Sequence, residues 1–217
     1  MEKDPMFKNL LSQGFALLLL PFLAMPLQAQ EFVEGQHYSK LSQMVRTQDP
    51  SRVEVVEVFG YWCPHCNDFE RYMNPWKETL SESVDLKHLP VIFSPKQAEF
   101  AKAYYVSVAL GVEQETHSAL FSLIHQQRSW INNKEQLGDF FADFGVSEAD
   151  FNRAYGSFAL NSQLSLGKKK ASEYKITGVP SMVVNGKYVV TAGSAGSQKA
   201  MLDVVDYLVA QEQAALK

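Results

Sequence analysis

The stretch Val53-Glu54-Val55-Val56-Glu57-Val58-Phe59-Gly60-Tyr61-Trp62-Cys63-Pro64-His65-Cys66 decides how this chain is interpreted. Its first half is an apolar, β-branched run that predicts a buried strand, and Gly60 ends that run. Its second half holds the only two cysteines of the 217 residues, two positions apart. A C-x-x-C pair directly behind a strand predicts a redox-active disulfide.

The start of a helix should make the two cysteines unequal. Proline is favoured at the first position of a helix because its fixed φ suits the turn, so Pro64 predicts that Cys63 is the N-cap. A thiolate at that position faces the free backbone N–H groups of the first turn and the positive end of the helix dipole. We therefore expect Cys63 to be the exposed, acidic sulfur and Cys66 the buried, resolving one. His65 is expected to favour the Cys63 thiolate.

Two other interpretations of the pair are weaker. A closed zinc site needs four ligands, and with no third cysteine the rest would have to come from four scattered histidines, so we expect no metal. These are His37, His88, His117 and His125. A purely structural disulfide is also possible, but this spacing closes a very small loop, and the stabilisation from a cross-link grows with loop length.

The N-terminal residues predict export. Phe15 to Leu27 is an apolar run that contains two prolines and follows two lysines. It is shorter than the roughly 20 residues that a membrane-spanning helix needs. We therefore expect a signal peptide over residues 1–29, cleaved near Ala29, with Met6 as an alternative start, rather than a core helix. Export would place the cysteines in a compartment where disulfides persist.

Charge indicates no nucleic-acid partner. The formal net charge is −4, and the one cationic run, Lys168-Lys169-Lys170, is typical of a solvated helix face.

The pattern of apolar residues divides the remaining chain into three stretches. Residues 30–94 predict a strand near 37–41, the strand at 53–59, a helix to about residue 80 that Pro75 should kink or restart, and a strand at 84–93. Residues 95–173 are helical throughout in pattern. Residues 174–217 predict a hairpin around Asn185-Gly186 and a terminal helix capped by Ser197. This order predicts an α/β protein with the thioredoxin fold, interrupted by an all-helical insertion.

Two segments carry a family resemblance. Residues 57–66, with their C-P-H-C sequence, and residues 178–188, Gly-Val-Pro-Ser-Met-Val-Val-Asn-Gly-Lys-Tyr, resemble the DsbA family of bacterial periplasmic thiol-disulfide oxidases. The similarity in layout covers the chain after the predicted signal peptide.

The resemblance also implies roles for single residues. Cys63 would be the sulfur that a substrate thiolate attacks, and Cys66 would be the resolving cysteine. The dipeptide Pro64-His65 would tune the redox potential of the Cys63–Cys66 pair. Val179-Pro180 would be a cis-proline loop that pairs with the substrate backbone.

Glu57 falls where the family has a buried acid beneath the cysteines. From the residues alone Glu57 could equally be exposed, since Glu54 and Glu57 point to opposite faces of a strand. A lysine often accompanies the family's acid on the next strand. Lys87 is nearby but one position out of register, so it is not assigned.

The resemblance implies a periplasmic dithiol oxidase that introduces disulfides into newly exported proteins. It further implies a quinone-coupled membrane reoxidant of the DsbB type, no bound cofactor, and a monomer. The alternatives are a disulfide isomerase or reductase, and a non-catalytic peptide-binding module. Isomerases of the DsbC type carry an extra N-terminal dimerisation domain, for which the residues before the first predicted strand leave no room.

Overall fold

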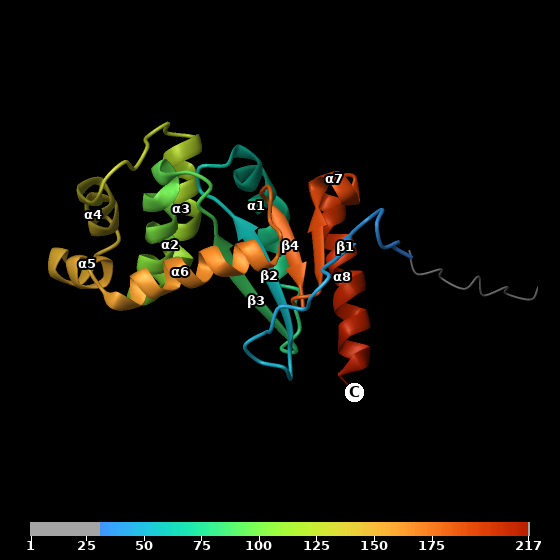
Figure 1. Ribbon diagram of the computed structural model, residues 1–217. Coiled ribbons are helices and arrows are strands. Elements are labelled where there is room, and N and C mark those ends of the chain that lie inside the picture. The colour runs from blue at the N-terminus through green and yellow to red at the C-terminus, as the bar shows by residue number, and fades with distance from the viewer. Residues whose placement is uncertain (1–30, 217) are drawn as a thin grey trace, which may run out of the picture. The chain divides into compact units, whose positions relative to one another are not determined.

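A computed structural model describes residues 31–216, and the predicted signal peptide lies outside this range. The described chain contains a five-stranded mixed sheet in the order β1-β5-β4-β2-β3 (Figure 1). The strands are β1 (Ser39–Lys40), β2 (Val53–Phe59), β3 (Val84–Pro90), β4 (Ser181–Val184) and β5 (Tyr188–Thr191). β2 runs parallel to β3 and antiparallel to β4, so the central strand joins the early and late parts of the sequence.

The helices cover both faces of this sheet. Helix α1 (Pro64–Lys77) connects β2 to β3, and α8 (Gln198–Ala215) packs with it against the face that carries Val53 and Val55. The opposite face, which carries Val56 and Val58, packs against the end of α6 (Phe158–Glu173). Successive strand residues point to opposite faces, and each face of β2 carries valines that pack against a helical layer. The whole strand is therefore buried.

The segment between β3 and β4 is helical, as its pattern predicts. It starts with a 3-10 turn, η1 (Pro95–Gln97), and continues with α2 to α6. Their bounds are α2 (Ala98–Leu110), α3 (Glu113–His125), α4 (Lys134–Ala142), α5 (Glu148–Tyr155) and α6 as above. Helix α5 is capped by Ser147, whose side chain accepts from the Asp150 N–H. The aromatic residues of these helices form a second core that includes both cysteines.

The element ends differ from the predictions at several points. β1 has two residues rather than the expected five. β3 ends at Pro90 rather than at 93, because its partner β2 ends at Phe59, the residue that pairs with Pro90. Helix α1 runs through Pro75 without a restart and ends at Lys77. The short helix α7 (Ala192–Ala195) was not predicted.

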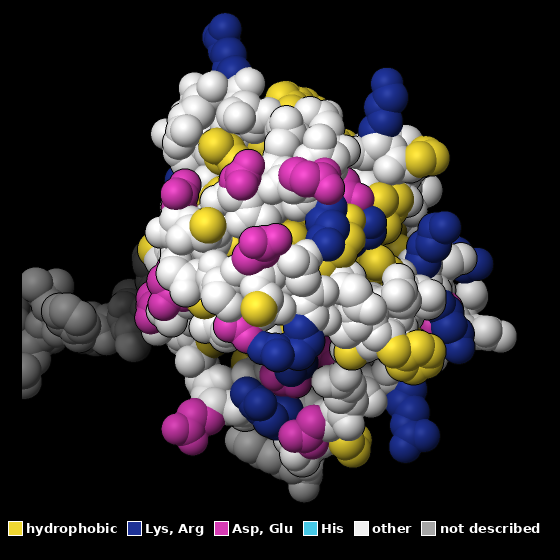
Figure 2. All heavy atoms as spheres, turned by 90° about the vertical axis from the view of Figure 1, so that its left-hand side faces the viewer, with side chains coloured by type: hydrophobic (Ala, Val, Ile, Leu, Met, Phe, Trp, Pro, Cys, Tyr) yellow, Lys and Arg dark blue, Asp and Glu magenta, His cyan; other side chains and the backbone are white. Residues whose placement is uncertain are grey.

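The surface over the helical segment carries mixed charge. Figure 2 shows Lys and Arg side chains interspersed with Asp and Glu side chains on the side that lies at the left of Figure 1.

The hairpin between β4 and β5 has the turn that its sequence predicts. Asn185 and Gly186 have positive φ of 49° and 61°, and the Lys187 N–H donates to the Val184 carbonyl at 2.9 Å. A Cβ on Gly186 would overlap the carbonyl oxygen of Val45, so this turn also needs glycine for space.

We predict that Gly186→Ala destabilises the protein more than Gly145→Ala does. Gly145 has a φ of 77° with open space around a Cβ, so it should lose only the roughly 1–2 kcal/mol of a left-handed alanine. Gly186→Ala should lose about 1–3 kcal/mol more, because Val45 must move. Urea titrations of both variants measure the difference, and equal losses would contradict the steric explanation.

Candidate active site

The two cysteines lie where the chain leaves the central strand. Residues 60–62 turn the chain after β2, and the Cys63 N–H donates to the Gly60 carbonyl at 2.9 Å. Cys63 is the N-cap of α1, with extended backbone angles (φ −91°, ψ 116°), and Pro64 is the first helical residue. The N–H groups of Cys66 and Asn67 donate to the Cys63 carbonyl at 3.1 and 3.2 Å. The predicted helix start is therefore confirmed.

Cys63 is more covered than expected. Its exposed fraction is 5%, against 0% for Cys66, so the predicted order holds but Cys63 is not an open sulfur. The cover comes from a neighbouring loop, whose Val179 carbonyl oxygen lies 3.5 Å from the Cys63 Sγ. Both cysteines are free thiols in this structure.

The surroundings of the two sulfurs give them opposite acidities. The pKa of Cys63 is lowered to about 6, chiefly because the Cys66 thiol donates a hydrogen bond to its thiolate. The backbone N–H groups of Cys66 and His65 and the charge of His65 act in the same direction, against the effect of burial. The pKa of Cys66 is raised, first by burial and then by the neighbouring Cys63. The neutral Cys63 thiol makes no hydrogen bond to the N–H groups of the helix start. Because the thiolate does accept such bonds, they favour the ionised form over the thiol.

The loop before β4 brings Val179 and Pro180 to the cysteines. The Val179-Pro180 peptide bond is cis, and β4 begins at the next residue, Ser181. Ser181 pairs with Val58, near the end of β2, and this register places the loop beside the start of α1. The resemblance anticipated this arrangement, although the two segments are more than a hundred residues apart in the sequence.

Glu57 is completely buried, and so is Glu54 on the other face of β2. An exposed Glu57 was therefore a wrong alternative. The Glu54 carboxylate lies 3.4 Å from Lys170 Nζ and from the Tyr174 hydroxyl. Neither oxygen of Glu57 has a hydrogen-bond partner among the described residues. Burial raises the pKa of Glu57, and the nearby Glu70 raises it further.

His88, not Lys87, is the residue of β3 that faces Glu57. The register pairs Glu57 with His88 and Val56 with Lys87, and Lys87 instead forms an ion pair with Asp85 at 3.0 Å. His88 Nε2 lies 3.4 Å from Glu57 Oε2, a contact that is too poorly aligned to be a hydrogen bond. From the sequence alone, His88 stood out only as one of the histidines that a zinc site would need. The parallel register of the two strands was the signal that could have identified it.

Further polar groups near the cysteines come from parts of the chain that sequence reasoning did not connect. The Tyr61 hydroxyl lies 2.9 Å from His117 Nδ1, and His125 Nε2 lies 2.7 Å from the Tyr61 carbonyl oxygen. Gln198, at the start of α8, donates to the His65 carbonyl at 2.6 Å. Nothing in the sequence pattern of α3 or α8 marks these residues.

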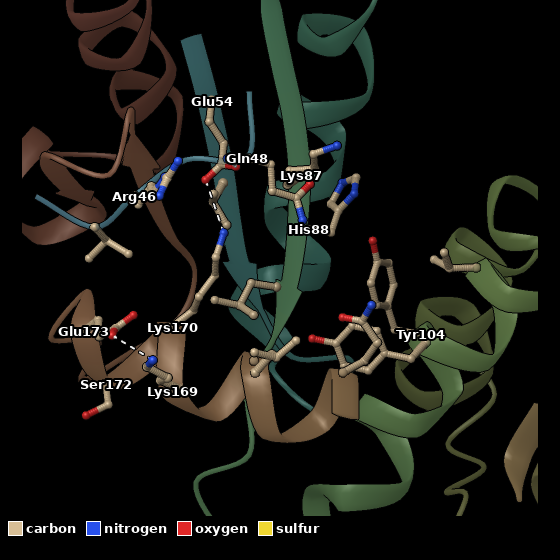
Figure 3. A pocket seen from close by; sticks show the side chains of 18 of the residues that line it. Arg46, Gln48, Glu54, Lys87, His88, Tyr104, Lys169, Lys170, Ser172 and Glu173 are labelled. Carbon is tan, nitrogen blue, oxygen red and sulfur yellow. Dashed lines mark hydrogen bonds and ion pairs between the residues drawn. The ribbon is translucent and has the colours of Figure 1, made fainter. Parts of the chain in front are cut away.

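A cavity of about 980 Å³ lies between α6, β3 and the loop at residues 41–48. Figure 3 shows Glu54 and Lys170 approaching each other at one part of its wall, with His88 and Tyr104 at another. Over residues 31–216 there is no cluster of three or more His, Cys, Asp or Glu that could hold a metal ion. None of the helices in that range is long and apolar enough to cross a membrane.

We predict that the absorbance of the Cys63 thiolate rises with a midpoint near pH 6 in the reduced protein, because the pKa of Cys63 is lowered to about 6. Cys66→Ala should move this midpoint up more than His65→Ala does, since the Cys66 thiol is the largest of the groups that lower this pKa and the His65 charge the smallest. Ultraviolet titration measures both midpoints. A wild-type midpoint near the free value of about 8.5 would show that these groups do not stabilise the Cys63 thiolate.

Comparison with known proteins agrees with this geometry. Residues 54–202 match the DSBA-like thioredoxin domain family. The thiol:disulfide interchange protein DsbA of Pseudomonas aeruginosa is 38% identical over 201 residues, which cover 93% of this chain and 95% of that protein. The protein of the same name from Azotobacter vinelandii is 38% identical over 202 residues, which cover 93% and 94%.

Solved structures give the same result. The crystal structure of Pseudomonas aeruginosa DsbA has a TM-score of 0.81 at 39% identity and covers 85% of this chain and 96% of that one. The oxidoreductase DsbA from Xylella fastidiosa has a TM-score of 0.79 at 30% identity and covers 84% and 98%. The chain therefore belongs to the family of DSBA-like thioredoxin-domain proteins.

Proposed function

We propose that this thiol:disulfide oxidoreductase is a dithiol oxidase that introduces disulfides into newly exported, unfolded proteins. The observation that carries the proposal is the unequal pair: a thiolate of low pKa at the start of α1, beside a buried thiol of raised pKa. An environment that stabilises the Cys63 thiolate stabilises the reduced pair, and this makes the disulfide a stronger oxidant. The relatives that are named thiol:disulfide interchange proteins support the same class of reaction.

The reaction proceeds in two exchanges. A substrate thiolate attacks the Cys63 sulfur of the disulfide, which forms a mixed disulfide and releases Cys66 as a thiolate. A second substrate thiolate then attacks the substrate sulfur, which forms the substrate disulfide and releases the Cys63 thiolate. In this second exchange Cys63 is a good leaving group, because its pKa is the lower of the two cysteine pKa values.

Residues around the pair support these steps. Pro64 begins the helix that presents Cys63, and the charge of His65 favours the thiolate. The carbonyl of Val179 beside the Cys63 sulfur, and Pro180 behind it, offer an edge where an extended substrate segment can pair. Burial raises the pKa of Glu57 and so favours its protonated form, which makes this carboxyl the candidate proton donor to the released Cys66 thiolate.

We also propose the compartment in which the protein works and the partner that reoxidises it. Residues 1–29 act as a signal peptide that is cleaved near Ala29, and the mature protein works in the periplasm as a monomer. A quinone-coupled membrane protein of the DsbB type restores the disulfide. Residues 95–173 are a helical insertion between the two parts of the thioredoxin domain, 30–94 and 174–217.

We predict that the Cys63–Cys66 couple equilibrates with glutathione well above the roughly −300 mV of structural disulfides. The oxidised protein should form disulfides in a reduced, unfolded substrate. Cys66→Ala should retain substrate in a mixed disulfide at Cys63, whereas the matched variant Cys63→Ala should retain none. A couple below about −300 mV, with no substrate retained, would favour the non-catalytic peptide-binding module. Faster reactivation of a scrambled substrate than of a reduced one would favour the isomerase.

A further inference from the structure

One hydrogen bond joins the last helix of the chain to the active-site sequence. The side-chain amide of Gln198, the first residue of α8, donates to the backbone carbonyl of His65 at 2.6 Å. A carbonyl oxygen only accepts, so the amide presents its NH2 group to this oxygen. The two residues are 133 positions apart in the sequence. Because the bond reaches the backbone, it does not depend on the imidazole at position 65.

The packing of α8 against α1 holds Gln198 in this place. One turn further along each helix, Met201 of α8 and Phe69 of α1 lie in the same buried core. Near the end of α1, the Trp76 indole N–H donates to the Asp206 carboxylate at 2.8 Å. The two helices are therefore joined both near the start and near the end of α1, which fixes Gln198 relative to the cysteines.

The carbonyl that Gln198 contacts belongs to the same peptide group as the Cys66 N–H. That N–H is one of the groups that lower the pKa of Cys63, because it donates to the thiolate. It also donates to the Cys63 carbonyl at 3.1 Å, so it is shared between this oxygen and the sulfur. One peptide group thus lies between the amide of Gln198 on its oxygen side and the Cys63 sulfur on its nitrogen side.

Hydrogen bonds that are linked in this way strengthen one another. A donor on the carbonyl oxygen polarises the peptide group and makes its N–H a better donor. In the same way, a thiolate at the N–H makes the carbonyl a better acceptor for Gln198. A disulfide sulfur carries no charge and gains little from this effect. The bond from Gln198 should therefore be stronger in the reduced protein than in the oxidised protein.

We infer that Gln198 is a positioning residue that shifts the redox equilibrium of the Cys63–Cys66 pair toward the reduced form, by polarising the peptide group that faces the Cys63 sulfur. The inference rests on the proposed function, since it concerns the oxidising strength of the same pair. In the exchange that defines this equilibrium, two glutathione thiols reduce the protein disulfide and become glutathione disulfide. Gln198 itself gains or loses neither a proton nor an electron.

A redox titration of Gln198→Met tests this role. Methionine is as long as glutamine but has no N–H to donate. We expect the equilibrium with glutathione to move about two- to fourfold toward the protein disulfide, the size expected when a charge-assisted bond loses the support of a linked one. Acid quenching followed by alkylation of the free thiols measures the equilibrium. If this variant does not fold, Gln198→Ala removes the same donor and should give the same shift.

A matched control comes from the other end of α8. The side-chain amide of Gln213 donates to the Ser83 hydroxyl at 2.8 Å, so Gln213→Met removes a comparable bond from the same helix. It should leave the equilibrium with glutathione at the wild-type value. At pH 8, Gln198→Met should lower the unfolding free energy of the reduced protein more than that of the oxidised protein, whereas Gln213→Met should lower both equally.

A second background separates the backbone from the imidazole. In His65→Ala, the substitution Gln198→Met should still shift the equilibrium by the same factor, since the accepting carbonyl remains. A shift that disappears in this background would overturn the inference, because Gln198 would then act through the imidazole. A wild-type equilibrium in folded Gln198→Met, or an equal shift in Gln213→Met, would overturn it as well. A wild-type couple as reducing as a structural disulfide would instead contradict the proposed function.

Discussion

The start of helix α1 is the constraint on which the rest of the site depends. A helix leaves its first backbone N–H groups without partners inside the helix, and here Cys63 stands directly in front of them with Pro64 behind it. The thiolate can use those N–H groups, whereas a disulfide sulfur gains little from them. The helix start therefore favours the reduced pair, together with the Cys66 thiol and the charge of His65.

The remainder of the fold makes this local preference useful. The sheet places α1 at the carboxyl end of a fully buried strand, and the return of the chain through β4 sets Val179 against the Cys63 sulfur. The helices between β3 and β4 enclose Cys66 and Tyr61 in an aromatic core. This enclosure raises the pKa of Cys66 and isolates Glu57 from water.

Much of this arrangement could be predicted from local patterns. The strand before Gly60, the N-cap at Cys63 and the turn at Asn185-Gly186 each depend on neighbouring residues, and the structure confirms them. The placement of His88 opposite Glu57 depends instead on the register of two strands that lie about thirty residues apart in the sequence. The contact of Tyr61 with His117 depends on how α3 packs, and periodicity within one helix cannot give that. Cys63 is more covered than predicted because its cover comes from a distant loop.

The most direct test of the account is the difference in unfolding free energy between the reduced and the oxidised protein, measured as a function of pH. The folded pKa of Cys63 is about 6, below the free value of about 8.5, so this thiolate stabilises the reduced protein fully above about pH 8.5, and that stability is lost as the pH falls through 6. Above pH 9 the raised pKa of Cys66 acts in the opposite sense, so the informative window is pH 6 to 9. We predict a reduced form more stable than the oxidised form at pH 8, by a margin that shrinks toward pH 6. A more stable oxidised form, or a margin that does not change with pH, would show that the fold does not stabilise the Cys63 thiolate.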